Sequence, residues 1–188
     1  VEAPALIHLL GNKELLYNEN SIAIIGSRNA DDVGSDIAYQ LAKSYALKGN
    51  VIVSGLALGC DSSAHQGCID ANGKTIAVVA SGLNIVHPKA NESLQKEIIN
   101  KGGLIISEQP FGVKANPVRL YARNRLQAAL VQKVIVVQCA VKSGTMNTVY
   151  FAHKYGCKIY AVAYGQYDKH NAGNEYILNK GIGFPIKL

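Results

Sequence analysis

Clusters of glycine and serine directly after short apolar runs are the residues of this sequence best suited to hold a ligand. The members that we predict to contact a phosphate are Gly26, Ser27, Ser54, Gly55, Ser81, Gly82, Ser143, Gly144 and Thr145. Small side chains let backbone N–H groups approach a phosphate, and the N-terminus of a following helix adds positive potential. Each cluster alone could be only a tight turn, but their recurrence favours a phosphate-bearing ligand. The spacing matches neither GxGxxG nor GxxxxGK(S/T), so no dinucleotide or ATP cofactor is expected.

The arginines point to the same class of ligand, because a planar guanidinium is a good fork for phosphate oxygens. Arg28 follows the first apolar run, where a phosphate would lie, and Arg123 and Arg125 flank Asn124. Two positions along a helix differ by about 200°, so the last two arginines should not face the same phosphate. We predict that one of them holds Glu108 while the other faces the ligand, and that Asn124 fixes a loop.

Weaker candidates surround these residues. Lys89 lies in a His-Pro-Lys-Ala-Asn turn that we expect to cap a helix starting near Glu92, and it is either a ligand-binding cation or a plain surface lysine. Phe111, Tyr121 and Tyr164 could stack on nucleobases, although core packing is the alternative for each of them.

Asp61 and His65 have the i, i+4 spacing of an acid/base or metal-binding pair. No third ligand stands at a recognisable spacing, so we predict neither a metal site nor a catalytic residue. Asp61 is instead expected to be a helix N-cap, with His65 as its hydrogen-bonded neighbour.

Six short Val/Ile-rich runs must position these loops. They span residues 22–25, 51–53, 75–79, 104–106, 134–137 and 159–163, and their continuous apolar character is typical of strands buried on both faces. Segments with helical spacing lie between them and close at Gly49, Gly102 and Gly156. The pattern predicts an α/β, Rossmann-like fold with a mainly parallel sheet and helices on both faces. The ligand-binding loops then share the carboxyl edge of the sheet, and the stretch through Tyr17 forms a short helix and a lead-in.

Composition sets the outer limits. The chain has 188 residues and a net charge of +6, which fits a polyanionic partner, and its length predicts one domain over residues 1–188. No apolar run approaches the roughly 18 residues of a membrane span, so a cytoplasmic protein without a membrane partner is expected. The four cysteines form no CxxC pair, which favours buried free thiols over a zinc site or a disulfide framework.

Several of these segments resemble the DNA-processing protein A (DprA/Smf) family. Residues 24–28 (IIGSR) and 54–65 (SGLALGCDSSAH) resemble its first strand and its long glycine-rich signature, and Ser107-Glu108, Arg123-Asn124-Arg125 and Ser143-Gly144-Thr145 follow in family order. The resemblance implies a homodimer that binds single-stranded DNA in a basic pocket and helps to load the RecA recombinase during natural transformation. It also implies that Arg28 and Lys89 contact DNA, and that the helical and winged-helix domains that often flank this fold in the family are absent from the chain.

Two other functions stay open. Enzymes of the LONELY GUY type share the fold class and hydrolyse nucleoside monophosphates with a glutamate three residues after a Gly-Thr pair, where this chain has Thr148. A nucleotide sensor without catalysis needs no such carboxylate and is the second alternative, ahead of a purely structural module. We therefore expect no enzyme activity.

The apolar C-terminal segment is the candidate for the dimer contact. It contains Tyr176, Ile177, Leu178, Ile182 and Phe184. Packing on the chain's own sheet is the alternative.

Overall fold

A computed structural model of the chain describes residues 3–166 and 168–187 and contains one eight-stranded sheet. Its strands are β1 (His8–Gly11), β2 (Ser21–Ile25), β3 (Val51–Ser54), β4 (Thr75–Val78), β5 (Leu104–Ser107), β6 (Lys133–Val136), β7 (Lys158–Val162) and β8 (Phe184–Ile186). They lie in the order β1-β5-β4-β3-β2-β6-β7-β8, and only β1 runs antiparallel to its neighbour. The predicted Rossmann-like α/β class is confirmed.

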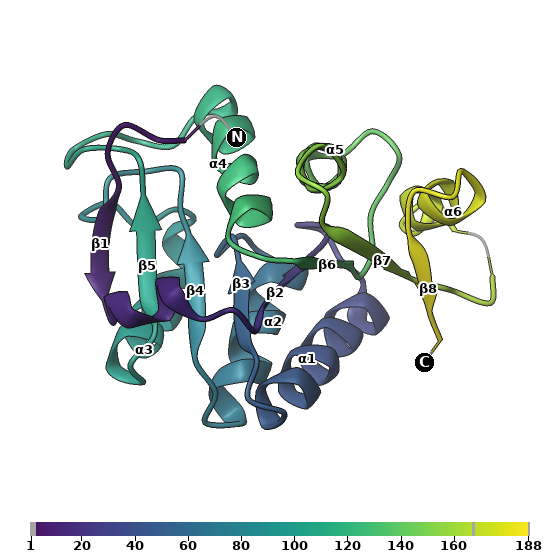
Figure 1. Ribbon diagram of the computed structural model, residues 1–188, viewed down its shortest axis with the longest axis horizontal. Coiled ribbons are helices and arrows are strands. Elements are labelled where there is room, and N and C mark those ends of the chain that lie inside the picture. Colours follow the sequence, from purple (N-terminus) through teal and green to yellow (C-terminus); the bar gives the residue numbers. More distant parts are fainter. Residues whose placement is uncertain (1–2, 167, 188) are drawn as a thin grey trace.

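Helices cover both faces of this sheet (Figure 1). The first three, α1 (Asp32–Leu47), α2 (Cys60–Asp70) and α3 (Glu92–Asn100), lie below it in the view of Figure 1, and α4 (Pro117–Ala129), α5 (Gly144–Lys154) and α6 (Ala172–Asn179) lie above it. Two 3-10 turns, η1 (Lys13–Tyr17) and η2 (Lys89–Asn91), complete the fold. The change of face follows from right-handed crossovers, because the chain moves outward from β2 to β5 and then returns to β6 on the other side.

The alternation of side chains along each strand builds the two cores. On β2, Ile22 and Ile24 pack below the sheet with α1 and α2, whereas Ala23 and Ile25 pack above it with α4 and α5. This two-sided burial explains why the six predicted strands have no polar positions to mark a solvent face.

The two edge strands were not predicted. The short helix predicted before residue 18 is the 3-10 turn η1, and the lead-in to it contains the strand β1. Both edge strands are largely exposed and very short: β1 has four residues, with only two apolar ones between His8 and Gly11, and β8 has three, of which the middle one is Pro185.

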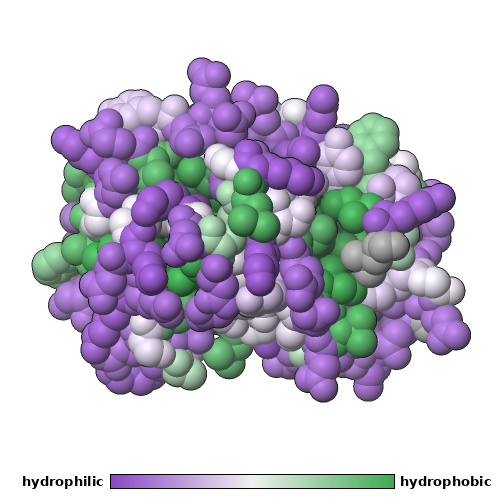
Figure 2. Space-filling model, turned by 90° about the horizontal axis from the view of Figure 1, so that it is seen from below, coloured by the Kyte–Doolittle hydropathy of each residue, from purple (hydrophilic) through white to green (hydrophobic). Residues whose placement is uncertain are grey.

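The C-terminal segment contributes mainly to its own core. Ile177 is fully buried, and Leu178 and Ile182 pack against the upper core. Phe184 on β8 remains 61% exposed. In the view from below, an apolar band is visible toward the β8 end, where no helix covers the sheet (Figure 2).

All four cysteines are free thiols. Cys60, Cys68 and Cys139 are fully buried, and burial raises the pKa of each thiol to about 12. Among the described residues, no group of three or more His, Cys, Asp or Glu side chains could hold a metal ion, and no helix is long and apolar enough to cross a membrane.

Candidate nucleic-acid interface

A cavity of about 380 Å³ opens at the carboxyl ends of β2 and β6. The strand order reverses here, since β3 lies on one side of β2 and β6 on the other, and the loops after β2 and β6 therefore diverge. Ligands of open α/β sheets bind at such a switch point. The cavity, hereafter the switch-point cavity, is lined by the loop after β2, by α4 and by the start of α5.

Two arginines with different surroundings line the switch-point cavity. Arg28 is exposed at the cavity's opening. Arg123 is only 6% exposed; its Nη1 donates to the carbonyl oxygens of Gly55, at 2.6 Å, and Val78. Its Nε has no hydrogen-bond partner among the described residues. Arg123 thus presents a fixed positive charge to the cavity, while Arg28 is free of such constraints at the rim.

Asp61 is the carboxylate that faces this buried guanidinium. It lines the cavity, is itself buried, and accepts a 3.4 Å hydrogen bond from the N–H of Ala57. Burial raises the pKa of Asp61, and the charge of Arg123 opposes that rise. Burial also lowers the pKa of Arg123 to about 10, which leaves the guanidinium protonated at neutral pH.

The N-terminus of α5 forms the opposite wall. Ser143, Gly144 and Thr145 all line the cavity. The Thr145 hydroxyl donates to the Gly26 carbonyl oxygen at 2.9 Å, and Asn124 Nδ2 donates to the Gly144 carbonyl oxygen at 3.1 Å. These bonds hold the helix end against α4 and β2, so its unpaired N–H groups and positive dipole end are fixed at the cavity. Asn124, which was predicted to fix a loop, thus binds the first residue of α5.

At two of the predicted glycines, neighbouring atoms lie too close to leave room for a side chain. A Cβ at Gly55 would lie 2.6 Å from Asp61 Oδ2, and one at Gly26 would lie 2.7 Å from Cys60 Cβ. Gly26 lines the switch-point cavity, and Gly55 lines a smaller neighbouring cavity of about 180 Å³ that Arg28 and Arg123 share. Ser27 also lines the larger cavity.

Apart from Arg125, which is described below, four predicted residues lie elsewhere. Ser54 and Ser81 are fully buried and donate to the carbonyl oxygens of Ile24 and Ile85, both at 2.7 Å. Gly82 is buried as well, and Lys89 is exposed and 2.5 Å from Glu92 Oε2. None of the four lines either cavity, so the structure gives them turn-forming or surface positions.

The three aromatic candidates separate in the same way. Tyr121 lines the switch-point cavity. Phe111 is exposed beside His8, with ring centroids 6.5 Å apart, and Tyr164 donates to the Val137 carbonyl oxygen at 3.0 Å while packing on the lower core. Only Tyr121 of the three is positioned to meet a ligand in this cavity.

Arg125 pairs with Glu108, as predicted for one of the two neighbouring arginines. Its Nη1 and Nη2 donate to Glu108 Oε2 and Oε1 at 2.6 and 2.5 Å, in a bidentate geometry. Glu108 does not line the cavity, and Thr148 does.

Asp61 is not the N-cap of α2 and does not pair with His65, so both predictions were wrong. Gly59, with a φ of 71°, is the N-cap of α2, and Asp61 lies inside the first turn. His65 contacts Thr75 Oγ1 through Nδ1 at 2.7 Å instead of Asp61. A positive φ favours glycine at the cap, and the sequence shows this only as one glycine among many.

Sequence reasoning also missed several wall residues. Leu120, Gln127 and Asn147 line the cavity from α4 and α5. Each lies three or four residues from a predicted member of the site, so helical spacing could have found them.

The comparisons with known proteins agree with this geometry. The model of the family "DNA recombination-mediator protein A" matches residues 1–186. The DNA processing protein DprA of Bacillus subtilis is 34% identical over 180 residues, which are 96% of this chain and 60% of that protein. The DprA of Streptococcus pneumoniae is 34% identical over 182 residues, 96% of this chain and 63% of that protein.

Solved structures give the same result. The X-ray structure of DprA from S. pneumoniae has a TM-score of 0.90 at 33% identity and covers 99% of this chain and 64% of that one. A DNA processing protein A from Helicobacter pylori, described for its single-stranded DNA binding mode, has a TM-score of 0.89 at 31% identity, with 99% and 84% covered. Molybdenum cofactor carrier proteins share only the fold, for example at a TM-score of 0.57 and 19% identity. The chain thus spans about 60% of the length of the first two curated relatives named here.

Proposed function

The chain belongs to the DNA recombination-mediator protein A family, and from this membership we propose that it binds single-stranded DNA at the switch-point cavity and acts in DNA processing during natural transformation. The observation that carries the proposal is the wall of this cavity: an exposed Arg28, a buried Arg123 and the N-terminus of α5 face one space. All three favour an anion, and a nucleic-acid backbone supplies one at every nucleotide.

Single strands are favoured over duplex because the cavity is surrounded by the loop after β2, by Ala57 and Asp61 after β3, by α4 and by the start of α5. A nucleotide can enter it only if its base is free of a pairing partner, and in a duplex that requires unstacking and unpairing. Contacts to phosphate from Arg28, Arg123 and the N-terminus of α5 carry no sequence information, so we propose little dependence on sequence.

Arg28→Ala tests the proposal. We expect the affinity for an oligothymidine strand to fall about tenfold or more, because a charge-assisted hydrogen bond to phosphate is lost. The plot of log affinity against log salt concentration should flatten by about 0.7, the contribution of one phosphate contact on a single strand. Fluorescence anisotropy titrations at several salt concentrations measure both.

Lys180→Ala is the control, since Lys180 is exposed at the end of α6 and lines neither cavity. Equal losses for Arg28→Ala and Lys180→Ala would mean diffuse charge attraction, and the proposed site would then be abandoned. Lys89→Ala, which removes a lysine paired with Glu92, should have a smaller effect than Arg28→Ala.

We further propose a cytoplasmic homodimer that assists RecA loading. The exposed Phe184 and Tyr176 at the C-terminal end support a contact there, although Ile177 is already used in the chain's own core. Light scattering at micromolar concentration should show twice the 20.1 kDa mass of the chain. A single 20 kDa species would contradict the dimer.

We also propose that the cavity does not cleave glycosidic bonds. Thr148, which in the sequence takes the place of the glutamate of the LONELY GUY type enzymes, lines the cavity and has no carboxylate, and the buried Asp61 faces Arg123. Release of adenine from AMP above a protein-free control would overturn this statement.

A further inference from the structure

One third of the chain contains no acidic residue. Residues 109–166 include eight lysines and arginines but no Asp or Glu, although the whole chain has 13 acidic residues. This segment forms α4 and α5, which pack against each other above the sheet (Figure 1). A polyanion that lies along these two helices is attracted by their positive side chains, and no carboxylate of residues 109–166 repels it.

Two exposed tyrosines lie on this pair of helices. Tyr121 on α4 is 48% exposed and Tyr150 on α5 is 57% exposed. Both rings make edge-on contacts with Phe151, at centroid distances of 5.5 and 5.4 Å, and Phe151 is buried. The buried ring supports both tyrosines in defined orientations, so they present aromatic surface to solvent at a reduced entropic cost. We name Tyr121 and Tyr150 the tyrosine ridge.

The tyrosine ridge is continuous with the switch-point cavity. Tyr121 lines the cavity itself, and so does Asn147 on α5. Tyr150 and Lys154 follow Asn147 at i+3 and i+7, which places the three on one side of the helix. From Asn147 to Lys154 the helix rises about 10 Å, so this face leads away from the cavity toward the positively charged last turn of α5.

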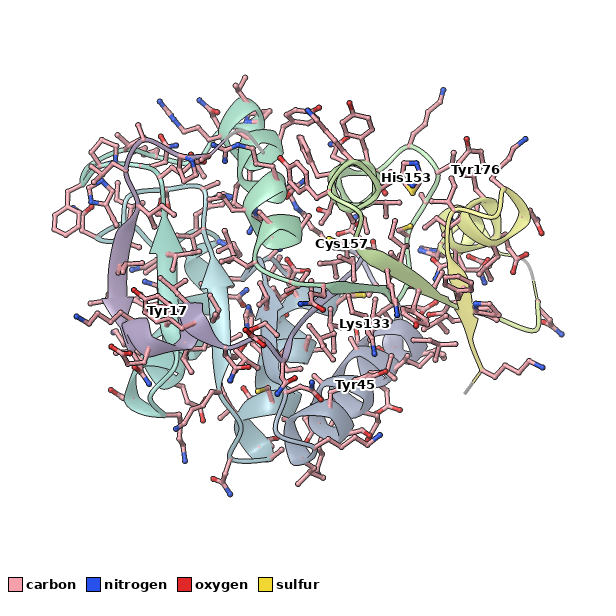
Figure 3. The ribbon with its side chains drawn as sticks, in the orientation of Figure 1. Tyr17, Tyr45, Lys133, His153, Cys157 and Tyr176 are labelled. Carbon is pink, nitrogen blue, oxygen red and sulfur yellow. The ribbon has the colours of Figure 1, made fainter. Side chains whose placement is uncertain are left out.

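The side of α5 next to Tyr150, which carries His153 one turn further along the helix, faces α6. Figure 3 shows His153 on that side, in the direction of Tyr176 on α6. The tyrosine ridge contacts Phe151 between α4 and α5 and shares no residue with the C-terminal end on which the proposed dimer contact depends.

We propose that the α4–α5 face is the path of the DNA strand outside the cavity: nucleotides adjacent to the one held in the cavity stack their bases on Tyr121 and Tyr150. The phosphates of these nucleotides lie near Arg119 on α4 and Lys154 on α5. The inference rests on the proposed function, because a strand must enter the cavity before it can continue along this face.

Stacking explains why tyrosines and not only cations are found on this face. Every base has an aromatic surface, so stacking on tyrosine tolerates any sequence, and a duplex hides these surfaces between its base pairs. A partner protein would need a complementary acidic surface instead, and the test below separates the two because it uses DNA alone.

Tyr150→Ala with two lengths of oligothymidine tests the path. A strand of about 3 nucleotides fills little beyond the cavity, and one of about 12 nucleotides reaches past it, within the site sizes of small single-strand-binding folds. We expect Tyr150→Ala to lower the affinity for the longer strand about fivefold or more, because one base–aromatic stack is lost, and to leave the affinity for the shorter strand unchanged. Tyr150→Phe, which keeps the ring, should bind both lengths like the wild type.

Tyr17→Ala is the matched control for an exposed tyrosine. Tyr17 ends η1, lies well apart from α5 in the view of Figure 3 and lines neither cavity, so we expect no loss of binding with either length. A Tyr150→Ala protein that binds the longer strand like the wild type would overturn the path, and so would equal losses with both lengths. Arg28→Ala should lower the affinity for both lengths and therefore tests the cavity separately. The proposed path along α4 and α5 can thus be contradicted while the proposed function still holds. A wild-type protein that binds neither length contradicts both.

A fluorescence signal gives a second measurement. The chain contains no tryptophan, so Tyr150→Trp introduces a single indole at the ridge. The longer strand should quench its emission and the shorter one should not. Quenching by neither length, in a variant that still binds the longer strand by anisotropy, would contradict stacking at this position.

Discussion

At the scale of single residues, His65 shows how burial selects one protonation state. The Thr75 hydroxyl donates to the Ile52 carbonyl oxygen at 2.7 Å, so it can only accept from His65 Nδ1. The proton therefore lies on Nδ1, and the buried Nε2 has no partner among the described residues. Burial, with a smaller contribution from Arg123, lowers the pKa of His65 to about 3.

This lowered pKa makes the free energy of unfolding depend on pH. Between pH 6.5 and about 3, the unfolded chain binds a proton at His65 and the folded chain does not. Stability therefore falls as the pH drops through this window, by about 1.4 kcal/mol per pH unit from this one group. In His65→Asn, whose amide can still donate to Thr75, urea titrations between pH 7 and pH 4 should show a shallower decline by about that amount. Parallel declines in the two proteins would assign the acid sensitivity to other groups.

The site could be read from the sequence only in part, and particular residues show why. Gly26, Arg28 and Thr145 were placed together correctly because strand ends of a parallel sheet share one edge. Ser81 and Gly82 follow the same rule but are buried under the loop through Pro110, which folds back over them. Coverage by a distant loop leaves no local signal in the sequence.

At the scale of elements, α1 and α2 pack at a distance that only glycine permits. A Cβ at Gly67 on α2 would lie 2.9 Å from the carbonyl carbon of Tyr39 on α1. Helices can approach this closely only where one of them lacks a side chain, and backbone atoms cannot move aside as a side chain can.

Gly67→Ala should therefore destabilise the protein, although alanine is the better helix former by about 1 kcal/mol. We expect a net loss of about 1 to 3 kcal/mol in the free energy of unfolding, measured by urea denaturation. Gly144→Ala is the control, since nothing lies within 4 Å of a Cβ there, and it should be neutral or slightly stabilising. A stabilised Gly67→Ala protein would show that the two helices can separate at little cost.

Elements were predictable where burial was complete. All six inner strands were recognised because apolar residues, mostly Val and Ile, form a continuous run in each of them, whereas the edge strands β1 and β8 are too short to show such a run. The start of α2 was misplaced because Gly59 caps it through its backbone conformation, which a search for Asp, Asn, Ser or Thr cannot detect.

At the scale of the whole molecule, the charges are divided unevenly along the chain. Residues 109–166 carry eight lysines and arginines and no acidic side chain, while α1, α2 and α3 below the sheet each carry at least one Asp or Glu. The net charge of +6 thus combines +8 from residues 109–166 with −2 from the other residues, which hold 11 lysines and arginines and 13 acidic residues.

Salt dependence should reveal this division. Lys154→Ala on α5 should flatten the salt dependence of binding to the longer oligothymidine by about 0.7, while Lys43→Ala on α1 should not change it. Both residues are lysines on helices, so the comparison isolates the layer to which each belongs. Equal slopes for the two variants would mean that the strand does not distinguish the layers.

The buried thiols allow the rate of local unfolding to be measured by alkylation. A thiol reagent can reach Cys60 or Cys68 only after the sheet and α2 have separated, because both side chains are fully enclosed in the folded state. The rate of alkylation in native buffer then measures how often the lower layer opens, in the same way as amide hydrogen exchange. Cys60 lies directly beneath Gly26, so slower alkylation of Cys60 in the presence of a single strand would record the closing of the binding loop.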